Sequence, residues 1–188
     1  MKKVAGFTLI ELVVVIVILG ILAVTAAPKF LGLQVDARNA ALKGLEGSLK
    51  SALSVGYAKM VILGAENSAY ATNRTADGGS GMFSLDMSSI GCPSTKKPYC
   101  IFQYGYPSLN DDTLPRLVEN ISFNGRKIAD WTTLRDDQKI IITSTQNTML
   151  VGETTKAKVQ LKQNNCYLTY TPSKQAGELY SLTYTPCQ

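Results

Sequence analysis

The chain has 188 residues, 45% of them hydrophobic, and a formal net charge of +5. It contains no histidine, which removes the commonest general base and every Ser-His or Cys-His nucleophile pair, so we expect no enzymatic activity. Its Lys and Arg residues form no cluster interleaved with aromatic side chains, which argues against nucleic-acid binding. A chain of this length suits one globular domain plus an extended element.

An almost unbroken apolar segment, residues 7–27, follows Lys2 and Lys3. Two lysines before an apolar run are also typical of a cleaved secretory signal. This run, however, would form a helix about 31 Å long, enough to cross the hydrocarbon core of a bilayer. A small residue, Gly6, precedes the run, so cleavage there would leave the apolar helix on the mature protein. We therefore predict a leader at residues 1–6 and a transmembrane helix at 7–27.

One ionisable residue, Glu11, lies within the apolar segment, and a carboxylate there is a candidate functional group. If the chain is cut after Gly6, the α-amine of Phe7 becomes the new terminus, and Glu11 lies roughly 6 Å along the helix from it. In a bundle of identical helices both charges would lose water and would need partners. We expect Glu11 to pair with the Phe7 ammonium group of a neighbouring copy.

The sequence Gly6-Phe7-Thr8-Leu9-Ile10-Glu11 matches the cleavage motif of type IV prepilins. The chain thus resembles the type IV pilins and the related pseudopilins of type II secretion systems. This resemblance implies cleavage after Gly6 by a membrane prepilin peptidase and N-methylation of Phe7. It also implies a role for Glu11 in recruiting subunits and setting their register.

Beyond the apolar segment, residues 28–60 are predicted to continue the same helix in amphipathic form, with Glu46 and Lys50 as a favourable i,i+4 pair. Pro28 removes one backbone hydrogen bond and predicts a kink. The resemblance to pilins implies that the stretch from Gly20 to Pro28 can lose helicity in a filament. The apolar residues recur at helical spacing, at Phe30, Leu33, Ala37, Ala41, Leu45, Leu49, Ala52 and Leu53.

Residues 61–188 are predicted to form a globular β-rich head, with a loop at 77–81. Short β-prone runs at 101–106, 140–144, 148–151, 156–162, 166–171 and 179–185 predict an antiparallel sheet against which the helix packs, an α+β fold. Segments 111–119 and 129–138 are predicted as short helices or turns. The sequence LTYTP occurs at 168–172 and again at 182–186, which predicts two strands of one hairpin.

The chain has four cysteines, an even number typical of disulfides in an exported protein. Three connectivities are possible. We favour Cys92–Cys100 and Cys166–Cys187 because each closes a short loop and the second fits the predicted hairpin. A zinc site would need tight paired spacings such as Cys-x-x-Cys, which are absent. We expect no metal site and no cofactor. Type IV pilins commonly close a carboxy-terminal loop with a disulfide, at the place of Cys166 and Cys187.

Within the pilins, residues 7–41 are most similar to the mannose-sensitive haemagglutinin pilins of aquatic Gram-negative bacteria, and Tyr104-Gly105-Tyr106-Pro107 resembles a motif in their heads. The resemblance implies a single-pass inner-membrane precursor, an extracellular helical filament of identical copies, and attachment to surfaces. The implied partners are the prepilin peptidase, an inner-membrane platform with its ATPase, minor pilins, and a receptor on host or chitinous material.

Two other classes of protein are compatible with parts of the sequence. Pseudopilins share the amino-terminal motif, but the major ones have smaller heads with a calcium site and without paired cysteines, and we find no convincing acidic loop. An enzyme tethered by its first helix would need catalytic carboxylates. The pairs Asp111-Asp112 and Asp136-Asp137 are better explained as helix starts or solvated turns.

Overall fold

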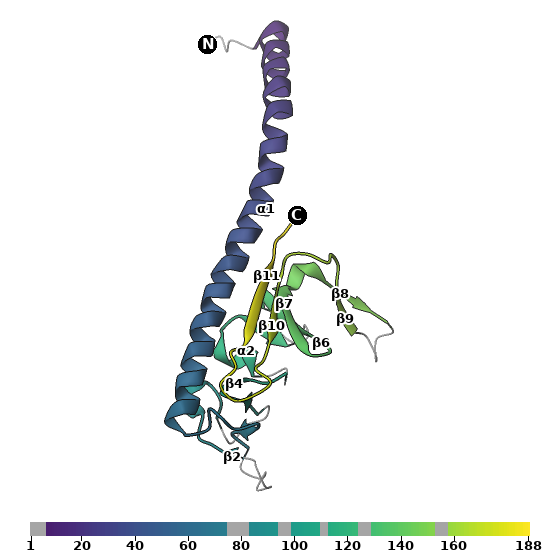
Figure 1. The fold of residues 1–188 in the computed structure, drawn as a ribbon. Helices are drawn as coiled ribbons and strands as arrows, with labels where there is room; N and C mark the ends of the chain where they lie inside the picture. Colours follow the sequence, from purple (N-terminus) through teal and green to yellow (C-terminus); the bar gives the residue numbers. More distant parts are fainter. Residues whose placement is uncertain (1–6, 75–82, 94–98, 110–112, 124–128, 153–157) are drawn as a thin grey trace. The chain divides into compact units, whose positions relative to one another are not determined.

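The computed structural model describes residues 7–74, 83–93, 99–109, 113–123, 129–152 and 158–188, and only the backbone of residues 27–31 (Figure 1). The chain divides into two compact units, Met1–Arg38 and Asn39–Gln188, and one helix, α1 (Leu9–Ile62), has residues in both. We call them the N-terminal unit and the head unit. The head unit therefore contains the second part of α1 as well as the predicted β-rich head, while the predicted loop at 77–81 lies outside the described residues.

The predicted long helix is confirmed, since α1 begins at Leu9 and ends at Ile62. The backbone remains helical through Pro28. The loss of helicity between Gly20 and Pro28 in a filament stays a prediction.

A glycine after the last turn ends α1. Gly64 has a left-handed backbone (φ 65°), and its N–H donates to the carbonyl of Val61 at 3.0 Å. The next N–H, of Ala65, donates to the carbonyl of Met60 at 2.9 Å, and both of these side chains are buried in the same cluster. These two bonds form a Schellman motif, in which glycine tolerates the left-handed conformation and the last helical carbonyls are satisfied.

The buried face of α1 in the head unit confirms the predicted stripe at Leu45, Leu49 and Leu53. The stripe differs from the prediction at one turn, where Leu42 is fully buried and the predicted Ala41 is exposed. The larger side chain gains more from leaving water, so leucine rather than alanine faces the core. The predicted ion pair is present on the outer side, where Glu46 and Lys50 approach to 2.6 Å, and this hydrogen bond raises the pKa of Lys50. The buried leucines of this face are Leu42, Leu45, Leu49 and Leu53.

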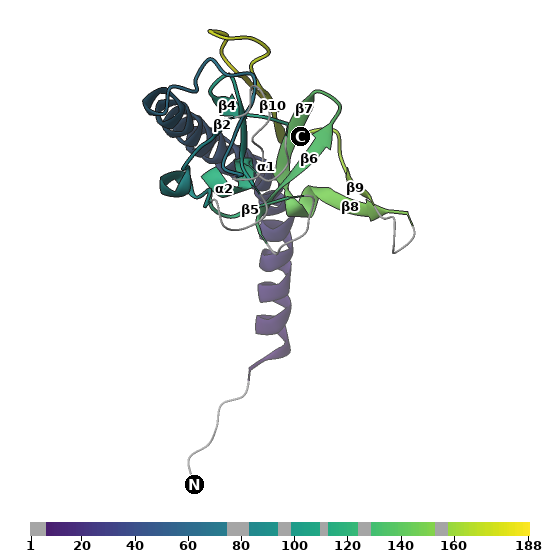
Figure 2. The same cartoon turned by 90° about the horizontal axis from the view of Figure 1, so that it is seen from below.

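A five-stranded sheet within the described residues lies beside the part of α1 in the head unit (Figures 1 and 2). Its side chains pack against these leucines. Its order is β11-β10-β7-β6-β5, and its neighbours are antiparallel except the parallel pair of β5 and β6. The short helix α2 (Leu114–Leu117) adds Leu114 to the same core. The strands are β5 (Ile121–Phe123), β6 (Trp131–Asp136), β7 (Lys139–Ser144), β10 (Tyr167–Thr171) and β11 (Ser181–Thr185).

The repeated LTYTP segments form the predicted hairpin. They lie in β10 and β11, which pair antiparallel with Leu168 opposite Tyr184 and Tyr170 opposite Leu182. Leu168 and Tyr170 are buried, and Leu182 and Tyr184 pack partly buried against the same cluster. The repeat therefore places a leucine and a tyrosine of each strand against the core.

Two predictions in the head are wrong. The run 101–106, predicted as one strand, contains the strand Ile101–Gln103 and a turn at Tyr104 and Gly105, both of which have positive φ angles. Residues 129–138 were expected to be helical or turn, but Trp131–Asp136 form strand β6. The turn comes after it, at Asp137, whose φ is 48°. The two aspartates suggested a helix start, whereas the preceding Trp131-Thr132-Thr133 are strand-forming residues that bury well on a pleated surface. In the other segment with this prediction, 111–119, the structure has the short helix α2.

Two smaller sheets within the described residues complete the head unit. One has the order β2-β1-β3-β4 and lies over a second buried cluster that includes Met60 and Phe102. The other is a ribbon of β8 (Thr148–Val151) and β9 (Lys158–Leu161), which follows the 3-10 turn η2 (Thr145–Asn147). The first sheet and its 3-10 turn are β1 (Ala71–Thr72), β2 (Phe83–Ser84), η1 (Ser88–Ile90), β3 (Ile101–Gln103) and β4 (Tyr106–Pro107).

Candidate assembly site

The first turn of α1 is held by reciprocal hydrogen bonds between Thr8 and Glu11. The Thr8 N–H and hydroxyl donate to Glu11 Oε2 at 2.8 and 2.7 Å. In return the Glu11 N–H donates to Thr8 Oγ1 at 3.4 Å. This is a capping box, which satisfies backbone donors that the helix itself leaves free. The sequence carries the signal for this box as Thr-x-x-Glu at residues 8–11, although Glu11 was predicted only as a partner for an amine.

The capping box leaves part of the Glu11 carboxylate available. Both bonds from Thr8 go to Oε2, and among the described residues no donor contacts Oε1. Phe7, the predicted methylation site, is exposed directly before the helix, while the predicted cleavage residue Gly6 lies outside the described residues. Cleavage after Gly6 would keep the Phe7–Thr8 peptide bond, so the capping box does not depend on the leader.

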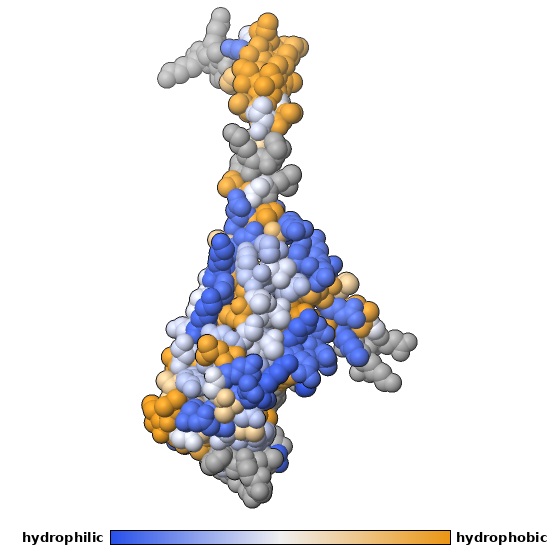
Figure 3. Space-filling view, in the orientation of Figure 1, coloured by the Kyte–Doolittle hydropathy of each residue, from blue (hydrophilic) through white to orange (hydrophobic). Residues whose placement is uncertain are grey.

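The helix surface beyond Glu11 is apolar and uncovered within the N-terminal unit. Leu9–Ala26 has a mean hydropathy of 3.0, and none of it is buried. Figure 3 shows hydrophobic side chains over this part of α1. By length and composition this helix could cross a membrane, although a signal sequence has the same properties.

In the head unit the structure contains the Cys92–Cys100 disulfide, with 5.8 Å between the Cα atoms. A buried amide, Asn73, holds both ends of the loop that this bond closes. Its Nδ2 donates to the carbonyls of Cys92 and Pro93, each at 2.9 Å, and its Oδ1 accepts from the Cys100 N–H at 2.9 Å. Asn73 therefore joins Cys92 and Pro93 to Cys100 by hydrogen bonds, in addition to the covalent bond.

The second disulfide, Cys166–Cys187, joins the start of β10 to the carboxyl end of the chain. An amide on α1, Asn39, binds the same end: its Oδ1 accepts from the Cys187 N–H and from the Tyr184 hydroxyl, both at 2.7 Å. The carboxy-terminal strand is thus attached both to the neighbouring strand and to the helix. Sequence reasoning missed both Asn39 and Asn73.

Tyr170 is a buried tyrosine of the core whose pKa is raised. Its hydroxyl donates to the carbonyl of Pro107 at 2.7 Å. Burial raises the pKa of Tyr170 well above its usual value of 10.0. The hydroxyl is therefore a neutral donor that attaches strand β10 to the chain at β4.

Candidate catalytic and metal-binding groups do not converge in the described residues. Asp136 forms an exposed ion pair with Lys139 at 3.1 Å in the turn between β6 and β7. Asp111 and Asp112 lie outside the described residues. The described part of the chain contains no group of three His, Cys, Asp or Glu side chains arranged to hold a metal ion.

The chain has an amino-terminal helix long enough to cross a membrane and an α+β head. Both features are consistent with the pilin fold. Residues 1–27 match the family described as the prokaryotic N-terminal methylation motif. This match covers Gly6, Phe7 and Glu11 and supports a type IV pilin-like or pseudopilin-like protein. No curated protein matches the chain, and no solved structure matches it.

Proposed function

We propose that the chain is a type IV prepilin, a structural subunit without catalytic activity. It is cleaved after Gly6, N-methylated on Phe7 and polymerised into a surface filament. The observation that carries this proposal is the uncovered apolar surface of Leu9–Ala26, which includes Glu11 of the capping box and begins directly after Thr8. Such a surface is stable only in a bilayer or against other apolar helices, and a filament subunit occupies both in turn.

The geometry at Glu11 supports a defined role in assembly. In the membrane, the capping box keeps the carboxylate hydrogen-bonded near the helix start. In a filament, Oε1 accepts a hydrogen bond from the Phe7 ammonium group of a neighbouring copy. The two charges then compensate each other where water is excluded. A neighbour shifted along the helix would leave both charges unpaired, so this pair selects one axial register.

Among pilins, the proposal is a subunit of a pilus like the mannose-sensitive haemagglutinin pilus, on a Gram-negative cell and used for attachment. This proposal is supported by residues 7–41 and by Tyr104-Gly105-Tyr106-Pro107, which resemble the corresponding parts of the mannose-sensitive haemagglutinin pilins. The subunit would depend on the prepilin peptidase, on the inner-membrane platform and its ATPase, and on minor pilins. A surface receptor would bind the finished filament. The two disulfides favour this subunit over the alternative, a type II secretion pseudopilin.

Substitutions of Glu11 test the proposal. Glu11→Gln keeps an oxygen that can accept from the Thr8 N–H but removes the charge, whereas Glu11→Ala removes both. We expect both variants to insert into the membrane and both to give few or no sheared filaments. Thr8→Ala, which removes the hydroxyl of the cap but keeps the carboxylate, is the matched control and should assemble much better.

The outcomes separate two roles of Glu11. Normal filaments from Glu11→Gln would show that the carboxylate serves as a cap only. Normal filaments from Glu11→Ala would exclude any role for this residue in assembly.

A further inference from the structure

A group of hydrogen bonds joins α1 to the carboxy-terminal segment at the first residue of the head unit, Asn39. Besides the two bonds that its Oδ1 accepts from Cys187 and Tyr184, the Asn39 Nδ2 donates to the Cys187 carbonyl at 3.4 Å. Asn39 is half-buried and Cys187 is buried, so these bonds are partly shielded from water. We call the residues Asn39, Tyr184 and Cys187 the Asn39 clamp.

The clamp lies where the side chains of α1 become buried. Before it, Leu33, Ala37 and Arg38 are exposed. After it, Leu42 is the first of the described α1 side chains to be fully buried. A helix in a protein takes most of its stability from tertiary packing. Loss of helicity that starts in the N-terminal unit would therefore reach the clamp before it reached the buried leucines.

The turns of α1 that follow the clamp are weak helix formers. They contain Gly44 and Gly47, and a Cβ atom at either position would meet open space. A glycine inside a helix is destabilising relative to alanine, and no close packing requires one here. Residues 39–47 therefore depend on their contacts with the rest of the head unit, which are made by Leu42, Leu45 and the clamp.

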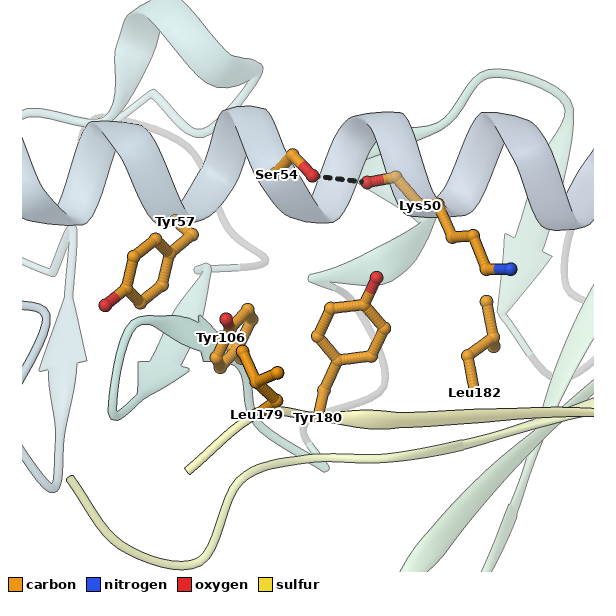
Figure 4. A pocket seen from close by; sticks show the side chains of 7 residues that line it. All are labelled: Lys50, Ser54, Tyr57, Tyr106, Leu179, Tyr180 and Leu182. Atoms are coloured by element: carbon orange, nitrogen blue, oxygen red, sulfur yellow. Dashed lines mark hydrogen bonds between the residues drawn. The ribbon is translucent and has the colours of Figure 1, made fainter. Parts of the chain in front are cut away.

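Farther along α1, its contact with the segment that leads into β11 is open. A hollow of about 490 Å³ lies between them (Figure 4). In this region Ser54 donates to the Lys50 carbonyl of α1 itself, at 2.9 Å, rather than to the carboxy-terminal segment. The clamp therefore closes by hydrogen bonds a contact that is open at these turns. We call this space the tyrosine hollow, and it is lined by Lys50, Ser54, Tyr57, Tyr106, Leu179, Tyr180 and Leu182.

The Cys166–Cys187 disulfide keeps Cys187 at the position that the clamp needs. Cys187 lies beyond the end of β11, at Thr185, so the disulfide and Asn39 hold it in place of strand pairing. On the other side of the bond, the Cys166 N–H donates to the Pro186 carbonyl at 3.1 Å. Cys166 directly precedes β10, whose residue Leu168 is fully buried. The disulfide thus attaches Cys187 to the core of the head unit.

We propose that the Asn39 clamp prevents loss of helicity in the N-terminal unit from extending into the head unit. The Cys166–Cys187 disulfide is part of this device, because it keeps Cys187 within reach of Asn39. When the disulfide is reduced, α1 loses helicity as far as Leu42. The device lies within one chain, so the inference goes beyond the proposed function and does not depend on the formation of a filament.

Hydrogen exchange of the full chain in detergent tests the clamp, with the amides of residues 39–47 as the reporter. Asn39→Ala should make these amides exchange roughly tenfold faster or more, because two short hydrogen bonds are lost and the helix opens locally more often. Helix propensity alone predicts slower exchange, since alanine favours a helix more than asparagine does. The matched control is Ser48→Ala, at an exposed position of α1 where the hydroxyl donates to the Gly44 carbonyl, and it should not speed exchange.

The conservative variant Asn39→Asp separates the clamp from a general effect of substitution. It keeps an oxygen that accepts from Cys187 and Tyr184, so it should retain most of the protection of residues 39–47. In each of these variants the amides of residues 49–60 should stay protected, because Leu49 and Leu53 are fully buried. Their protection shows that the head unit is folded.

A pair of disulfide variants tests the part assigned to Cys187. Cys166→Ser with Cys187→Ser should speed the exchange of residues 39–47 as Asn39→Ala does. Cys92→Ser with Cys100→Ser removes the other disulfide and should leave this exchange unchanged.

The outcomes distinguish the clamp from the proposed function. Unchanged or slower exchange of residues 39–47 in Asn39→Ala would overturn the clamp and leave the filament subunit intact. Faster exchange that extends equally through residues 49–60 would also overturn it, because Asn39 would then stabilise the whole head unit. Unchanged exchange after loss of the Cys166–Cys187 disulfide would contradict the part assigned to that bond.

Discussion

The two units of this chain differ in whether their apolar side chains are buried. In the head unit, leucines such as Leu49 are fully buried, and two disulfides and two asparagines join separate segments of the chain. In the N-terminal unit, the apolar side chains from Leu9 to Ala26 are all uncovered. The head unit contains its own core, whereas the helix needs a membrane or other copies to cover it. Predictions can therefore be made separately for each unit.

The largest effect is expected from a charge in the middle of the apolar helix. Ile16→Lys should abolish filaments, because a lysine at the centre of a membrane helix costs about 2.5 to 3.5 kcal/mol and would be unpaired in an apolar bundle. Filament yield after shearing measures this, and Ile16→Leu is the control. Normal assembly of Ile16→Lys would mean that this surface stays in contact with water.

A smaller effect, confined to the head unit, is expected from its core. Leu49→Ala should lower the free energy of unfolding by about 2 to 5 kcal/mol, because it leaves a cavity between α1 and the sheet. Chemical denaturation of the full chain in detergent measures this change. Val55→Ala, at an exposed position of the same helix, should change it by less than about 0.5 kcal/mol. Equal effects of both substitutions would contradict the assigned core face.

The smallest effect depends on pH. Because the folded-state pKa of Tyr170 lies above its unfolded value of 10.0, the folded protein holds this proton more tightly. Its contribution to stability is present in full below pH 10 and falls as the pH rises above that value. Tyr170→Phe should cost about 0.5 to 1.5 kcal/mol at neutral pH, through the lost bond to Pro107, and should reduce the loss of stability above pH 10. An unchanged alkaline profile would contradict this assignment.

The sequence predicted features that depend on local pattern. The apolar run and the motif around Gly6 and Glu11 are contiguous, and the LTYTP repeat predicted the β10–β11 hairpin because both of its strands carry the same residues. The Thr8–Glu11 capping box was equally local and could have been predicted. The strand β6 was missed because two aspartates at its end were given more weight than the Trp and Thr residues before them.

Other features could not be predicted because they depend on residues far apart in the chain. Asn39 lies 148 residues from Cys187, and no periodic pattern relates the two. Asn73 likewise binds a loop about 20 to 27 residues away. The tyrosine hollow combines residues of α1, β4 and β11 with those just before β11, so it exists only once the head unit has folded.

The most direct test of the central claim is the intact mass of protein sheared from the cell surface, measured before and after reduction. We expect a mass that begins at N-methylated Phe7 and is four hydrogens lighter before reduction, because both disulfides are formed. Processed protein confined to the inner membrane would instead favour the secretion pseudopilin. An intact Met1 terminus on a membrane-bound chain would contradict the account of a cleaved, assembled filament subunit.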